Sequence, residues 1–231
     1  MVYSMQGLKR TLGMLCLCVC TLPVLTYAQE SPQTIAREGY TLEYTNKSPD
    51  FDTAVGRRLI EAFFQVYPKE AARFNKKAAK KVSFVIDPAY EGVAATSGDV
   101  IVFNPGWFHA HPGDIDVVTH EAMHVVQAYP NESGPGWITE GIADYVRYVF
   151  GVDNAGANWA LPAFKPKQHY TQSYRVTARF FVWVEKKKNR DFVKKLDAAM
   201  RGKKYTDEIW KKLTGSTLDE LWNEYATNPA I

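Results

Sequence analysis

The pair His120 and His124 constrains this chain more than any other feature, because the spacing points to one kind of local structure. On a helix, side chains four residues apart lie on the same face, where two imidazoles can bind one metal ion. Glu121 directly follows His120 and would project beside that ion, where its carboxylate can take a proton from water. The pattern therefore predicts a helix that carries a metal site together with its general base.

The chain then turns back towards this site. Residues 114–129 have the apolar spacing of a helix that Asp114 could cap, and residues 130–136 are rich in proline and glycine. A second helix is predicted to begin near Trp137. Glu140 lies only about 4.5 Å into it, so an antiparallel turn would bring its carboxylate back to the metal. We expect His120, His124 and Glu140 as ligands, with water in the fourth position.

Asp144 lies one turn beyond Glu140 on the same helical face. It is suited to accept a hydrogen bond from the outer ring nitrogen of a ligand histidine, which fixes the tautomer of that ring. The reverse assignment, with Asp144 as the third ligand and Glu140 as the outer carboxylate, stays open because the sequence does not rank two carboxylates a turn apart.

Four segments resemble the basic secretory protein family of plants and bacteria: residues 81–88, 92–98, 120–130 and 134–147. The resemblance implies a zinc metallopeptidase-like domain of the gluzincin type, related in site layout to thermolysin. It implies that one Zn²⁺ is bound by His120, His124 and Glu140. It further implies that Glu121 is the general base and that Asp144 is an outer-shell aspartate.

The N-terminus has the pattern of a signal peptide. Lys9 and Arg10 precede the apolar residues 11–25, and small residues lead to Ala28, which predicts cleavage after residue 28. The apolar run is too short for a stable membrane anchor, so we expect a secreted or periplasmic protein. All the cysteines, Cys16, Cys18 and Cys20, lie inside this segment. The mature protein would therefore have no disulfides.

Composition points to one domain and against polyanion binding. The formal net charge is +3, of which Lys9 and Arg10 in the predicted signal peptide contribute two. The remaining basic clusters, at residues 76–81 and 185–190, lie at helix ends or before a strand, where solvated cations are ordinary. We expect residues 29–231 to form a single domain, a monomer without nucleic-acid partners whose substrate is a peptide or protein.

The predicted fold class is α+β, with a small N-terminal mixed sheet packed on helices, a zincin-like metal helix and a helical C-terminal half. Strands are expected at residues 40–45, 81–86 and 99–103, and helices at 51–67 and 69–74 with Pro68 between them. Later helices are expected at 170–187, 191–200, 205–213 and 218–226. We expect residues 98–103 to be an exposed edge that pairs with an extended peptide, with an interior strand as the alternative.

Peptide hydrolysis also needs a donor for the oxyanion, and Tyr174 at the start of a predicted helix is the candidate, with Tyr170 and His169 in reserve. His109 and His111 precede a proline in a loop and are read as surface residues. The predicted function is an exported zinc peptidase. The alternatives are a non-catalytic exported zinc-binding module on the same fold and a hydrolase of another amide or ester bond. Glu121 favours an enzyme, since a structural zinc site needs no base.

Overall fold

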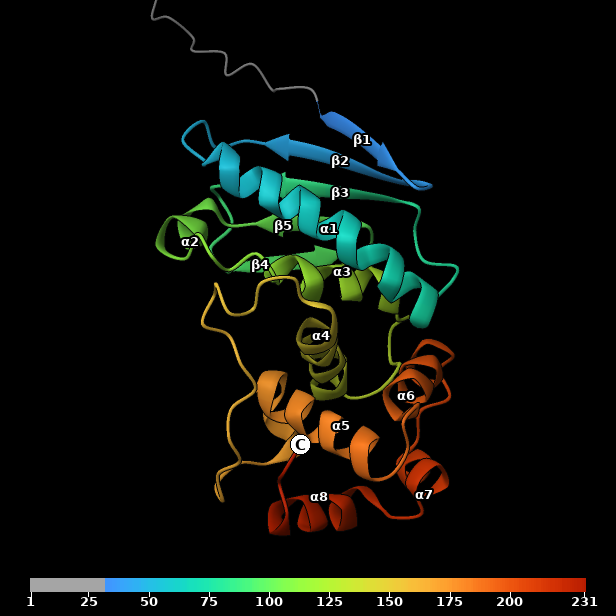
Figure 1. Cartoon of the computed structure of the whole chain (residues 1–231). Coiled ribbons are helices and arrows are strands. Elements are labelled where there is room, and N and C mark those ends of the chain that lie inside the picture. The colour runs from blue at the N-terminus through green and yellow to red at the C-terminus, as the bar shows by residue number, and fades with distance from the viewer. Residues whose placement is uncertain (1–31) are drawn as a thin grey trace, which may run out of the picture.

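A computed structural model describes residues 32–231; the predicted signal peptide, residues 1–28, lies outside the described residues. The fold is α+β, as predicted (Figure 1). A five-stranded mixed sheet has the order β1-β2-β3-β5-β4. Its strands are β1 (Gln33–Arg37), β2 (Tyr40–Asn46), β3 (Lys81–Ile86), β4 (Ala94–Ser97) and β5 (Val100–Phe103). β2, β3 and β5 are parallel neighbours, and β1 and β4 pair antiparallel at the two edges.

The prediction that residues 98–103 form an exposed edge is wrong. β5 lies between β3 and β4, and its Ile101 and Phe103 are 0% exposed. The edge on that side is β4, whose sequence Ala-Ala-Thr-Ser lacks the large β-branched and aromatic residues typical of strands. β4 forms because Gly98, at φ +61°, makes a tight turn that folds the chain back along β5.

Helix α1 (Thr53–Arg73) lies across one face of the sheet (Figure 1). It is a single helix, so the predicted break at Pro68 is wrong. Proline removes one backbone donor, but α1 buries an apolar face that includes Leu59, Phe63 and Tyr67 against the sheet. Burial on this scale, about 1.5–3 kcal/mol per large apolar side chain, outweighs the local loss.

The next three helices contribute residues to the cleft described below: α2 (Pro105–Ala110), α3 (Val117–Gln127) and α4 (Gly136–Phe150). α3 begins after Asp116, not Asp114 as predicted. The carboxylate of Asp116 is fully buried and accepts hydrogen bonds from the backbone N–H groups of Val152 and Asp153 at 2.7 and 2.6 Å. It therefore ties the start of α3 to the chain that leaves the end of α4.

The C-terminal half is helical and lies on the far side of α4 from the sheet (Figure 1). It contains a 3₁₀ turn (Tyr170–Gln172), α5 (Tyr174–Lys187), α6 (Phe192–Arg201), α7 (Glu208–Thr214) and α8 (Leu218–Thr227). α5 packs so closely on α4 that a Cβ at Gly141 would lie 2.3 Å from Thr177 Cγ2. Glycine at position 141 thus allows the close approach. Within residues 32–231, no helix is long and apolar enough to cross a membrane.

Candidate metal centre

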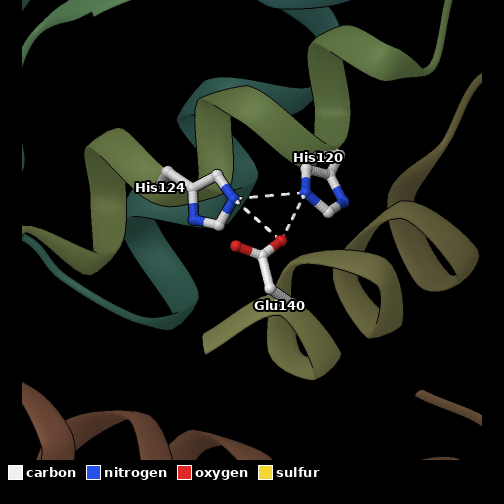
Figure 2. Close-up of side chains that lie close together, drawn as sticks. All are labelled: His120, His124 and Glu140. Atoms are coloured by element: carbon white, nitrogen blue, oxygen red, sulfur yellow. Dashed lines mark hydrogen bonds and ion pairs between the residues drawn. The ribbon is translucent and has the colours of Figure 1, made fainter. Parts of the chain in front are cut away.

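Three side chains from α3 and α4 converge on one point (Figure 2). The Nε2 atoms of His120 and His124 lie 3.1 Å apart. Oε2 of Glu140 lies 3.2 Å from the first and 3.6 Å from the second. The antiparallel return of the chain brings these residues together. α3 ends at Gln127, the next residue Ala128 has a left-handed conformation, and α4 starts at Gly136.

These separations are compatible with zinc. Two ligand atoms about 2.1 Å from a tetrahedral ion lie about 3.4 Å from each other, and the three observed distances bracket this value. The donor set of two imidazole nitrogens and one carboxylate oxygen is also one that Zn²⁺ favours. Among residues 32–231, this trio is the group of potential ligands that meets the spacing for a metal ion.

The outer nitrogen of each histidine has an acceptor. Nδ1 of His120 lies 2.7 Å from Oδ1 of Asp144, and Nδ1 of His124 lies 2.7 Å from Oε1 of Gln127. Gln127 also donates from Nε2 to the carbonyl oxygen of Thr139 at 2.9 Å, which links α3 to the residue before Glu140. A ring that donates through Nδ1 presents an Nε2 lone pair, so both histidines are set to bind a cation at the centre of the trio.

The pKa shifts of His120 and Glu140 also indicate that the site favours a positive charge between these side chains. Burial lowers the pKa of His120, but the hydrogen bonds with Asp144 and Glu140 outweigh it and raise the pKa to about 10. Burial raises the pKa of the Glu140 carboxyl, yet the hydrogen bonds with His120 and His124 hold it well below its usual value. The arrangement therefore stabilises a carboxylate that faces a proton or a metal ion.

Glu121 lies in the same cleft, 7% exposed. Its Oε2 accepts a hydrogen bond of 2.7 Å from the hydroxyl of Thr96, which lies on edge strand β4. Thr96 also contacts the backbone carbonyl of Glu121 at 3.0 Å. The carboxylate is thus held between α3 and the sheet edge.

The cleft around these residues has a volume of about 1100 Å³ and is lined by β4, α3, α4 and the start of α5. Tyr174 lines it, is 56% exposed, and lies with its ring 6.2 Å from that of His120. Ser173 and Tyr174 both have positive φ, +61° and +47°, an uncommon conformation that turns the chain into α5 beside the cleft. The negative charge of Glu140, followed by burial, raises the pKa of the Tyr174 phenol.

The other candidates lie elsewhere. Tyr170 donates to Asp219 at 2.7 Å, and His169 caps the 3₁₀ turn. His109 is exposed on α2. His111 stacks on Trp107 and lines the cleft. Neither histidine belongs to the group of potential metal ligands in residues 32–231.

Two residues of the site were missed from sequence. Gln127 lies three residues after His124, and helical spacing alone could have suggested it as a partner. Thr96 lies 25 residues before Glu121 on a strand that the sequence did not reveal, so no local pattern identified it.

Residues 25–225 match a family model described as "Peptidase of plants and bacteria". No curated protein matches the chain. One similar solved structure is a two-domain M1 zinc metallopeptidase bound to L-tryptophan, at 13% identity and a TM-score of 0.42. The match covers 87% of this chain and 48% of that one, so the chain spans about half of its length. The family match extends over most of the sequence, and the chain therefore belongs to this family of peptidases, the basic secretory proteins that its motifs resemble.

Proposed function

We propose that this protein is an exported zinc-dependent peptidase whose ion is bound by His120, His124 and Glu140. The observation that carries the proposal is the convergence of two Nε2 atoms and one carboxylate oxygen within 3.1–3.6 Å, each histidine oriented by an acceptor on its other nitrogen. When bound there, Zn²⁺ would polarise both the attacking water and the scissile carbonyl.

The chain's own residues supply the proton transfers. Glu121 would accept a proton from the water and pass it to the leaving amine. Its hydrogen bond with Thr96 supports this role, because it holds one carboxylate oxygen in place and leaves Oε1 without a hydrogen bond within residues 32–231. Asp144 and Gln127 would keep the two ligand rings in their productive tautomers.

Tyr174 is the proposed donor to the oxyanion. It is the one of the three sequence candidates that lines the cleft, beside His120. Its raised pKa keeps the phenol protonated, as a hydrogen-bond donor must be.

Strand β4 is the proposed docking edge for an extended peptide. Asn104 donates to the carbonyl of Val93 at 3.1 Å, and Ala95 and Ser97 lie opposite Val102 and Val100. Hydrogen-bonded pairs alternate along an antiparallel ladder, so the backbone groups of Ala94 and Thr96 point away from β5. Thr96 also contacts Glu121, which places this edge beside the proposed base.

Residues 29–231 would act as a single domain after removal of the signal peptide, and export would place them outside the cytoplasm. The mature protein would carry no cysteine, so zinc and the buried core, not disulfides, would stabilise it. A non-catalytic zinc-binding module on the same fold is the alternative. The open 1100 Å³ cleft and the presence of Glu121 favour the enzyme.

The test is a cleavage screen of zinc-loaded protein against a peptide library that also contains ester and non-peptide amide substrates. We expect peptide cleavage that stops with chelator and returns with Zn²⁺. Glu140→Ala serves as the metal-free control. Zinc-bound protein that cleaves no peptide would refute the proposal, and cleavage that is indifferent to chelator would remove the metal from it.

A further inference from the structure

The cleft extends beyond the metal site towards the C-terminal end of α4. There it is lined by α2, the start of α3 and the loop before α5. Five lining residues form what we call the tryptophan end: Trp107, His111, Asp114, Arg147 and Trp159. None of them has a part in the chemistry proposed above.

Arg147 is the centre of this group. It lies seven residues after Glu140, which is two turns further on the same face of α4 and about 10 Å along the helix axis. The residue is only 5% exposed. Its Nη2 binds Asp114 at 2.5 Å, its Nε binds Asn154 at 3.1 Å, and the Trp159 ring lies 4.6 Å from the guanidinium carbon.

The third guanidinium nitrogen of Arg147, Nη1, is not used in these hydrogen bonds. Nη1 forms no hydrogen bond with any residue in 32–231, yet it is not among the buried unpartnered atoms of that range, which belong to Glu70 and Arg179. Because Arg147 lines the cleft, Nη1 is a donor kept open to it. A guanidinium already fixed on two sides loses little freedom when it binds a further acceptor.

The surroundings indicate what that acceptor is. Asp114 already balances the charge of Arg147, so a neutral carbonyl suits Nη1 without a second carboxylate. Trp107 stacks on His111 at 3.9 Å and donates to Asp114 at 2.9 Å, which fixes its ring. Trp107 and Trp159 are both half-buried, so each leaves indole surface in the cleft. Apolar rings beside one oriented polar donor are typical of a side-chain pocket with a backbone anchor.

We propose that the tryptophan end is a substrate subsite for an aromatic residue on the C-terminal side of the scissile bond, with Arg147 Nη1 donating to the peptide backbone there. The inference rests on the proposed function. β4 starts beside α2, where Val93 binds Asn104, and runs towards Thr96 at the base. A peptide antiparallel to β4 runs the other way, so its C-terminal part reaches the tryptophan end. Arg147 lies about 10 Å from Glu140 along the axis of α4, and this separation corresponds to about three residues of an extended substrate.

The test uses a peptide that the zinc-loaded enzyme cleaves. Phe and Gly versions are compared first at the second position after the scissile bond and then at the third. We expect kcat/KM to be roughly 10- to 100-fold higher for Phe at one of them. Trp159→Ala should lower kcat/KM for the Phe peptide at least tenfold more than for the Gly peptide. Tyr148→Ala is the matched control, because Tyr148 is an exposed aromatic residue of α4 outside the cleft lining.

Arg147→Lys keeps a cation opposite Asp114 but removes the free donor nitrogen. It should lower kcat/KM on both peptides by on the order of tenfold, mainly through KM, with zinc content preserved. It also loses the hydrogen bond from Nε to Asn154, so a small fall in melting temperature is expected. Arg147→Ala is unsuitable, because it would leave the Asp114 carboxylate buried and unpaired. Binding to zinc-loaded Glu121→Gln, measured by titration calorimetry, gives a readout without turnover, and the Phe peptide should bind at least several-fold more tightly.

Equal kcat/KM for Phe and Gly at every C-terminal-side position would overturn the subsite. So would a Trp159→Ala variant that slows both peptides equally. A Phe preference that lies on the N-terminal side and disappears in Trp159→Ala would overturn the proposed orientation. Failure of wild type to cleave any peptide would instead refute the peptidase function itself, so the two ideas fail separately.

Discussion

Glu70 should destabilise the folded protein, and its replacement should stabilise it. The side chain lies on the buried face of α1, is 0% exposed, and neither carboxyl oxygen has a hydrogen-bond partner within residues 32–231. Burial raises the pKa of Glu70 well above its usual value, although the nearby His120 opposes the shift. Glu70→Met has a similar volume and needs no hydrogen bond. It removes an unsatisfied polar group, which costs about 1–3 kcal/mol when buried.

The pH dependence gives this prediction its sign. Because the folded-state pKa of Glu70 is above the unfolded value, the native protein holds a proton that the unfolded chain releases. The contribution of Glu70 to stability is therefore at its best below pH about 4.3 and is lost as the pH rises, by up to about 1.4 kcal/mol per unit until the folded pKa is passed. The advantage of Glu70→Met over wild type should widen over the same range. Glu70→Gln also lacks the titrating group, so its advantage over wild type should widen by the same amount, from a smaller starting gain because its buried amide still lacks hydrogen-bond partners.

Urea unfolding between pH 5 and pH 8, with chelator present to exclude metal linkage, measures these differences. Glu61→Gln is the matched control on the same helix, since Glu61 is exposed and its hydrogen bond with Arg37 lowers its pKa. That variant should change stability little and show no pH trend between pH 5 and pH 8, because the lowered pKa of Glu61 places its titration below this range. A Glu70→Met variant that is less stable than wild type, or whose advantage does not grow with pH, would refute the reasoning.

Three further outcomes follow from the site. Glu140→Ala should abolish stoichiometric zinc binding, whereas Asp144→Asn should weaken zinc affinity by roughly 10- to 100-fold and Gln127→Met should weaken it by less. Competition with a chromogenic chelator measures these affinities, and the reverse order for the two carboxylates would exchange their roles. Tyr174→Phe should lower kcat by about 10²-fold with KM and zinc content little changed, and an unchanged kcat would exclude it as the oxyanion donor. Ala94→Pro removes a backbone donor that points away from β5, and should raise KM for a flexible peptide by about 2- to 10-fold; unaltered KM in a folded, zinc-loaded variant would show that peptides do not pair with β4.

The convergence of the candidate ligands could be predicted because their spacing follows helix geometry. His120 and His124 share a face at four residues' separation, and Glu140 and Asp144 repeat that spacing on the next helix. The short break between the helices leaves an antiparallel return as the compact arrangement. Local periodicity therefore carries the information: the structure brings His120, His124 and Glu140 together and places Asp144 against His120.

The missed features depend on contacts between distant segments. Nothing in the four small residues of β4 distinguishes a strand from a turn, and its edge position depends on how β5 pairs with β3. Pro68 normally ends a helix, and only packing against the sheet shows that α1 continues. Aspartate is a residue type that commonly caps helices, yet Asp114 instead forms an ion pair with Arg147, 33 residues later.

Zinc content and peptidase activity of Glu121→Gln, measured together, test the central claim most directly. The side chain lies beside the metal trio and is assigned to proton transfer, not to coordination. We predict close to one zinc per protein and a loss of activity of roughly 10²-fold or more against any peptide that wild type cleaves. Wild-type activity in this variant would contradict the role of Glu121 as the base, and loss of zinc would show that Glu121 is a ligand.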